Sequence, residues 1–167
     1  ETKEEAKLRQ WISNRAANDT VEPEKRAEAY IVLASKDWDC SFKMTELPAN
    51  KTTTIDPSNN KATVSYKKPK DQKDFDTAQM CVKQGLAEAE SAIKFDPNNE
   101  SAWSYKTNLL LEASKLAEMD GKTDVKAEYQ KQYEAALKRT TELSAAAKKK
   151  EEEEEEGGFL EKKFERN

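Results

Sequence analysis

Residues 95–103 read FDPNNESAW and join two segments that carry helical patterns. Pro97 has no backbone N–H and ends the helix before it, while Asn98 or Asn99 is suited to cap the helix after it. Trp103 follows six residues after the proline, early in that next helix. The stretch therefore predicts either an ordinary turn between two helices or the seam between two copies of a repeat.

The composition favours thin helical layers with wide solvated faces. Apolar residues make up 35% of the 167 residues and charged residues 37%, against about 45–50% and about 25% in an average globular chain. Glycine and proline number only 4 and 5, so most of the chain can be helical. The length suits one domain of ordinary size.

The charge pattern and the lengths of the apolar runs each argue against one kind of partner. The net charge is −4 with both signs interspersed, unlike the basic surface of a nucleic-acid-binding protein. No apolar run approaches the roughly 20 residues that a membrane-spanning helix needs. We therefore expect no nucleic-acid partner and no membrane span.

The sequence contains no histidine, which removes the commonest general base and the commonest metal ligand. Serine–histidine and cysteine–histidine nucleophiles are excluded, whereas lysine, carboxylate or tyrosine chemistry stays open. Glycine-rich phosphate loops, nucleophile elbows and metal-spaced clusters are also missing from the sequence. We predict a protein that is not an enzyme, with no catalytic residues, no cofactor and no metal.

Apolar residues at three- and four-residue steps predict three helices before the seam. The first lies within residues 1–18, and the second begins near Pro23, a residue suited to a first helical turn. Asp71 or Asp74 is suited to cap the third.

The same spacing predicts two helices after the seam. The fourth ends at Asp120-Gly121, and the fifth is capped by Asp124 and runs through KKKEEEEEE to Gly157-Gly158. The residues expected to face inward include Leu8, Trp11, Ile12 and Ala16 of the first helix, Trp38 and Phe42 of the second, and Val125 and Leu137 of the fifth.

Residues 47–70 depart from the helical pattern. The runs KTTTID and KATVSYK are separated by PSNN, and apolar or β-branched residues alternate in both runs. This pattern predicts a β-hairpin inserted between the second and third helices, with an irregular loop as the alternative.

The segment around the opening stretch resembles a tetratricopeptide repeat. That family has a small residue early in its second helix, another near the end of that helix and a proline five residues later, and Gly85, Ala92 and Pro97 match these positions. Trp103 then stands at the aromatic position of the next repeat. Ala89, where the family has an aromatic residue, is a departure.

Other positions match this family less completely. Tyr30, Leu33 and Ala34 fit the aromatic, leucine and small positions of an earlier repeat, whereas Thr141 replaces the proline of a later one. Lys106 and Thr107 stand where the family has leucine and glycine. The residues expected to pack the repeats are Tyr30, Leu33, Ala34, Trp38, Gly85, Ala92, Pro97, Trp103, Tyr133 and Ala136.

The resemblance implies an all-α antiparallel array of about five helices, with two degenerate repeats and the β-hairpin as an insertion. Such an array buries its apolar faces by stacking neighbours, and it generally needs three or more repeats for stability. We expect the first helix to cap one end, so the other end needs a further source of stability.

A disulfide is one such source. Cys40 lies late in the second helix and Cys81 early in the third, so antiparallel pairing of these helices brings the two residues close. The closed loop would contribute about 4 kcal/mol on the chain-entropy model. Two reduced thiols in a cytosolic protein are the alternative.

Self-association is a second possible source of stability. An uncovered array end can stack on the opposite end of a second copy, which makes a ring or an open filament, and the hairpin can pair edges between copies. The tail after Gly157-Gly158 offers Phe159, Leu160 and Phe164 for docking into a neighbour's groove; a solvated tail is the alternative. The resemblance itself favours a monomeric adaptor that binds a separate protein or peptide in its concave groove.

We divide the chain into a helical domain, 1–150, and a charged helix end and tail, 151–167. The start at Glu1 and the cysteines favour a mature exported protein, periplasmic or extracellular, over a cytoplasmic protein with a trimmed start. Export would allow glycosylation, with N-linked motifs at Asn18, Asn50 and Asn99 and possible O-linked sites at Thr52, Thr53 and Thr54. Asn99 is better explained as a helix cap.

Overall fold

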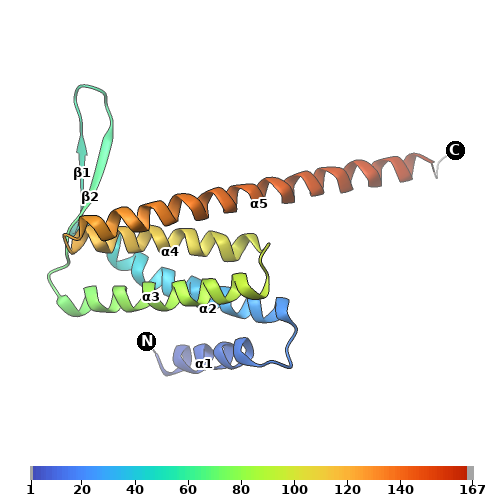
Figure 1. Cartoon of the computed structure of the whole chain (residues 1–167), viewed down its shortest axis with the longest axis horizontal. Coiled ribbons are helices and arrows are strands. Elements are labelled where there is room, and N and C mark those ends of the chain that lie inside the picture. The colour runs from blue at the N-terminus through green and yellow to red at the C-terminus, as the bar shows by residue number, and fades with distance from the viewer. Residues whose placement is uncertain (1, 165–167) are drawn as a thin grey trace.

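The computed structural model describes residues 2–164, with side chains as far as Glu153. The predicted all-α fold with a β-hairpin insertion is confirmed (Figure 1). The elements are α1 (Lys3–Ala17), α2 (Pro23–Thr45), the short 3-10 helix η1 (Pro48–Asn50), β1 (Lys51–Ile55), β2 (Ala62–Tyr66), α3 (Gln72–Phe95), α4 (Glu100–Met119) and α5 (Thr123–Phe164).

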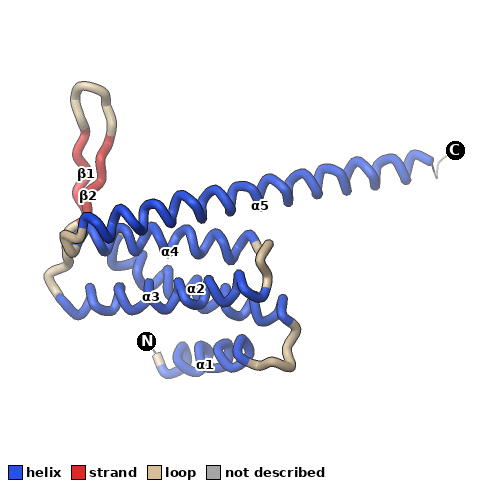
Figure 2. The backbone as a smooth tube through the Cα atoms, viewed as in Figure 1, coloured by secondary structure: helices blue, strands red, loops and turns tan. Residues whose placement is uncertain are grey.

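Consecutive helices pack as antiparallel neighbours, from α1 at one side to α5 at the other (Figures 1 and 2). Helix α4 contacts α2 as well as α3 and α5, so the pair α4–α5 stacks on the pair α2–α3. Helix α1 covers α2 on the opposite side. The two helices of a pair do not cover all of each other's apolar surface, so the stacking of one pair on the next buries the remainder.

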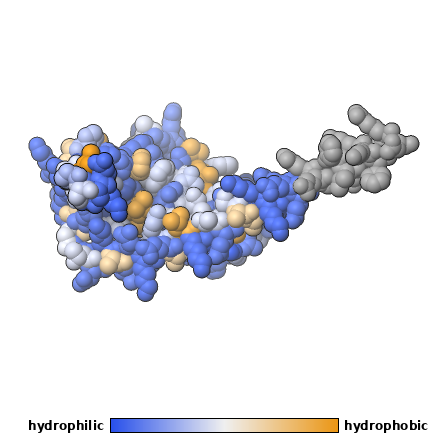
Figure 3. Space-filling view, turned by 90° about the horizontal axis from the view of Figure 1, so that it is seen from above, coloured by the Kyte–Doolittle hydropathy of each residue, from blue (hydrophilic) through white to orange (hydrophobic). Residues whose placement is uncertain are grey.

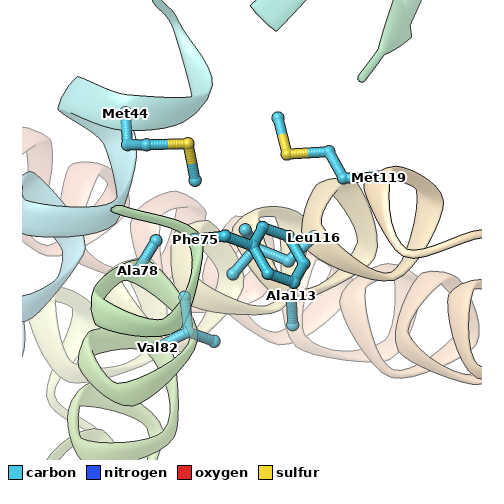
Figure 4. Close-up of a cluster of buried hydrophobic side chains, with 7 residues drawn as sticks. All are labelled: Met44, Phe75, Ala78, Val82, Ala113, Leu116 and Met119. Carbon is cyan, nitrogen blue, oxygen red and sulfur yellow. The ribbon is translucent and has the colours of Figure 1, made fainter. Parts of the chain in front are cut away.

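The core lies between α2, α3 and α4. Its largest cluster consists of Met44, Phe75, Ala78, Val82, Ala113, Leu116 and Met119 (Figure 4). A second cluster joins Ala34, Ala89 and Leu109. Alanines are frequent in both clusters, and small side chains allow the helix axes to approach closely.

The helix end and the helix cap predicted within residues 95–103 both form. Helix α3 ends at Phe95, and the side chain of Asn99 caps α4 by accepting a hydrogen bond from the backbone N–H of Ala102 at 3.2 Å. Asp96 accepts a hydrogen bond from the side chain of Asn99, and the indole N–H of Trp103 donates to the carbonyl of Pro97 at 2.9 Å. The nine residues therefore hold their own turn together through local bonds.

Gly85 lies where α3 closely approaches both α2 and α4. A Cβ at this position would lie 2.8 Å from a methyl of Leu109 on α4 and 3.0 Å from Cβ of Asp37 on α2. The missing side chain is therefore what lets α3 meet both neighbours here.

The hairpin is a two-stranded antiparallel sheet with Thr53 opposite Val64 and Ile55 opposite Ala62. Its turn is closed by Asp56, whose side chain accepts hydrogen bonds from Ser58, and Asn60 adopts the left-handed conformation with φ of 55°. The hairpin extends away from the helical body (Figure 1).

Several details differ from the sequence predictions. Helix α5 begins at Thr123, so Asp124 lies inside the first turn, where its charge complements the helix dipole instead of capping it. The α5 backbone also continues past Gly157-Gly158 to Phe164, crossing the predicted boundary at residue 150 without a break. In α1, Ile12 and Ala16 are buried whereas Leu8 and Trp11 are exposed.

Replacing Gly85 with alanine should destabilise the fold by about 1–3 kcal/mol, because the added methyl overpacks the contact with Leu109. Helix propensity alone predicts a gain of about 1 kcal/mol. Urea unfolding of Gly85→Ala measures the difference. Ala87→Gly, at an exposed position of the same helix, is the matched control and should lose only about 1 kcal/mol. A Gly85→Ala variant more stable than the wild type would contradict the close approach.

Candidate interaction surfaces

The predicted disulfide is present between Cys40 of α2 and Cys81 of α3, with 6.2 Å between the Cα atoms. It joins the two helices that flank the hairpin and closes a sequence separation of 41 residues. The covalent bond therefore fixes the pairing of α2 and α3 at the end where the hairpin enters.

The residues predicted to pack the repeats fall into two groups. Leu33, Ala34, Gly85, Ala92 and Ala136 are buried in the helix interfaces. The aromatic positions Tyr30, Trp38, Trp103 and Tyr133 are half-buried, and Pro97 is exposed in the seam. The small residues thus occupy close contacts, while the aromatic residues lie along the edges of the interfaces.

Helix α1 is held by a charged cluster. The guanidinium of Arg9 donates two hydrogen bonds to the carboxylate of Asp37 on α2, at 2.8 and 2.9 Å, and one to Glu88 on α3 at 3.0 Å. Asp37 is buried, and the second carboxyl oxygen of Glu88 is buried without a hydrogen-bond partner in the described part of the chain. One arginine therefore donates hydrogen bonds to two carboxyl groups.

Burial, and then the neighbouring Asp37 carboxylate, raise the pKa of Glu88 to about 8, although Arg9 opposes this shift. Near neutral pH the protonated form of Glu88 is favoured, and its O–H can donate a hydrogen bond to the Asp37 carboxylate, which also favours this form. The cluster is then a neutral acid beside one ion pair, which is easier to bury than two carboxylates with one cation.

A second charged network is buried where α2, α4 and the hairpin meet. Glu112 of α4 is almost fully buried and accepts hydrogen bonds from Thr45 at 2.6 Å and from Lys115 at 2.7 Å. Lys115 also donates to Glu46 at 2.9 Å, and hydrogen bonds from Lys51 and Lys115 lower the pKa of Glu46 to about 2. Burial disfavours the charged form of Lys115, but its hydrogen bonds to Glu112 and Glu46 raise its pKa. These partners hold the base of the hairpin against the helices.

An aromatic surface runs along α2 and α4. The ring of Trp38 lies 4.9 Å from that of Phe42 and 6.3 Å from that of Tyr105, measured between centroids. The ammonium of Lys115 lies over the rings of Phe42 and Tyr66, at 5.5 and 5.2 Å. Trp38 and Tyr105 are half-buried and Phe42 is at the edge of exposure, so the rings present one flank to solvent.

An open groove of about 470 Å³ lies between α3, α4 and the start of α5. Its floor is apolar and is lined by Val82, Leu86, Ala113, Leu116, Ala117 and Tyr129. Val125, predicted to face inward, is 43% exposed at this groove, and the charged lining residues are Lys83, Asp120 and Lys122. We call this surface the α3–α5 groove.

The hairpin carries two different faces. Thr53, Ile55, Ala62 and Val64 alternate onto one face, where Ile55 is 63% exposed. Thr52 and Thr54 share the other face with Thr63 and Ser65, so the three candidate O-glycosylation threonines are divided between faces. An isolated two-stranded hairpin is marginally stable in water, so the apolar face is a surface that a partner can cover.

Both ends of the helical stack leave apolar side chains exposed. On α1, Trp11 is 62% exposed and Leu8 47% exposed. On the last two helices, Leu111 of α4 and Leu137 of α5, the latter predicted to face inward, are also exposed. Apolar residues form separate patches on the body in Figure 3, whereas the coloured part of α5 that projects from it is largely hydrophilic.

The remaining predicted sites have different outcomes. Asn18 and Asn99 both use their side chains locally, Asn18 toward Thr20 and Asn99 as the α4 cap. The structure argues against glycosylation of Asn50, which is buried and donates to the carbonyl of Met44 at 2.8 Å. The side chains of the proposed docking residues Phe159, Leu160 and Phe164 lie outside those that the structure describes.

Within the described residues, no helix is long and apolar enough to span a membrane, and no three carboxylate, cysteine or histidine side chains are grouped as metal ligands. Comparison of the chain with protein-family models, curated proteins and solved structures found no match.

Reduction of the disulfide should lower the free energy of unfolding by about 4 kcal/mol, because it frees a loop of 41 residues in the unfolded chain. Urea midpoints with and without reductant measure this loss. The double variant Cys40→Ser and Cys81→Ser should match the reduced protein and ignore reductant. A wild type whose midpoint does not respond to complete reduction, verified by mass spectrometry, would contradict a stabilising role.

Stability should fall as pH rises from about 5 to about 8, by about 2–4 kcal/mol, because folded Glu88 holds its proton up to about pH 8 and the unfolded residue loses it near 4.5. Urea midpoints at both ends of this window measure the fall. Glu88→Gln, which stays neutral, should lose most of this dependence. Glu46, with its pKa lowered to about 2, acts only below this window. Equal midpoints for the wild type at both pH values would refute the assignment.

Proposed function

We propose that this chain is a non-enzymatic, exported structural subunit with tetratricopeptide-like repeats that self-associates by end-to-end stacking into a filament or other homo-oligomer. The observation that carries the proposal is the exposed apolar surface at both ends of the stack, above all Trp11 beside Leu8 on α1. Tryptophan is enriched where protein interfaces hold their binding energy, and a large apolar side chain on an end layer is what a stacked copy would cover.

The two ends differ, which determines the form of the assembly. One end is the single helix α1, and the other is the pair α4–α5 with Leu111 and Leu137. A contact between unlike surfaces is heterologous, and it produces a ring or an open chain of copies. The Cys40–Cys81 disulfide supports export, because such bonds persist mainly in oxidising compartments.

A monomeric adaptor is the second candidate. The aromatic surface of Trp38, Phe42 and Tyr105 favours it, because tetratricopeptide repeats usually bind a peptide or protein along the helices that line their concave side. In this reading the end layers are only solvated caps, and the partner is a separate protein.

The two candidates predict different behaviour of the purified chain. We expect sedimentation velocity at micromolar concentration and above to show species larger than a monomer, and negative-stain microscopy to show rings or filaments. Trp11→Glu should shift the protein toward the monomer, because it places a charge in the stacked interface. Met80→Glu, at a similarly exposed apolar residue of the interior helix α3, is the control and should behave as the wild type. A monodisperse monomer throughout would favour the adaptor.

A further inference from the structure

We infer that the α3–α5 groove of one copy receives the Phe159-Leu160 end of α5 from another copy. This inference rests on the proposed self-association and adds a specific contact to it. The groove offers an apolar floor with an accessible residue, Val125, at its surface. Its volume of about 470 Å³ lies within the range of about 300–1,000 Å³ in which proteins hold ligand-sized groups.

The charges of the groove and of the segment are complementary. Of the three charged lining residues, Lys83 and Lys122 are cationic, and the one carboxylate, Asp120, already pairs with Lys122 and Lys68. The charged residues at the rim of the groove, two lysines and one aspartate, therefore leave an excess of one positive charge. The segment places six consecutive glutamates, 151–156, two residues before Phe159-Leu160. An anionic run followed by an apolar pair matches a cationic rim around an apolar floor.

The geometry of α5 makes the contact intermolecular. The same helix that contributes Val125 and Tyr129 to the groove continues to Phe164 without a break. At about 1.5 Å of rise per residue, the backbone of Phe159 lies about 45 Å further along this helix than Tyr129. Figure 1 shows α5 leaving the body in one direction, so the segment cannot return to the groove of its own copy.

The consequence is a directional link. Each copy presents one groove near the start of α5 and one segment near its end, so a copy can accept one neighbour and dock onto another. Docking in sequence is heterologous and extends to an open chain or a larger ring, whereas mutual exchange of the two segments between two copies closes a dimer. The mode is a helix end laid into an apolar groove.

A double-mutant cycle tests the contact. The tail variant is Phe159→Asp with Leu160→Asp, and the groove variant is Val125→Asp, a change at an exposed position that should leave the fold intact. Each should raise the dissociation constant for self-association about tenfold or more. Combining them should add little further loss, because both remove the same contact. Met80→Asp, outside the groove, should match the wild type, and circular dichroism should show unchanged helix content in all variants.

Mixing separates the remaining possibilities. The tail variant keeps its groove and the groove variant keeps its tail, so an equimolar mixture should associate more tightly than either variant alone. If the wild type is a monomer, both the proposed self-association and this contact fail. If the wild type associates but the tail and groove variants match it, only this contact fails. Two further results would overturn the proposed contact. One is a double variant in which the losses of affinity add fully, and the other is a mixture that associates no more tightly than its components. Either result is expected if the groove binds another partner.

Discussion

The absence of a side chain at Gly85 is the constraint on which most of this structure depends. It brings α3 against Leu109 of α4 and against Asp37 of α2. Asp37 then lies at the meeting point of three helices, where it receives Arg9 of α1, and Glu88, on the next turn of α3, completes the cluster. One close approach thus sets the stacking of the pair α4–α5 on the pair α2–α3 and also provides the anchor for the first helix.

Some groups of this chain are paired or buried by its own residues, whereas some of its surfaces stay uncovered and available to other molecules. The disulfide, the charged cluster of Arg9, and the network around Glu112 are all formed within the chain by its own residues. Apolar side chains of the end layers, the apolar face of the hairpin and the floor of the α3–α5 groove are left uncovered by the described residues. A surface with this division is suited to repeated contact with copies of the chain, because every copy brings both halves of each contact.

The sequence was most informative where the interacting residues lie close together in the chain or on neighbouring helices. Proline, an Asn cap and a tryptophan acting within nine residues predicted the seam, and antiparallel pairing of two neighbouring helices predicted the Cys40–Cys81 bond. It was least informative about long-range pairs: Arg9 meets its carboxylates across 28 and 79 residues, and no periodicity marks such a meeting. The spacing of Leu8, Trp11 and Ile12 allowed a wide apolar face, and only the packing of α2 decided which part of it was buried. The α3–α5 groove needs three helices in place, so its lining could not be recognised in advance.

The position of the disulfide also determines what happens when a protease cuts the chain. The bond lies between Cys40 and Cys81, and the hairpin with its exposed turn is entirely enclosed by the covalent ring that it closes. A protease that cuts the projecting turn near Asn60 would leave α1 and α2 attached to α3, α4 and α5 by the sulfur bridge, with the helical body still assembled. Cleavage of this exposed, projecting turn therefore leaves the chain in one piece.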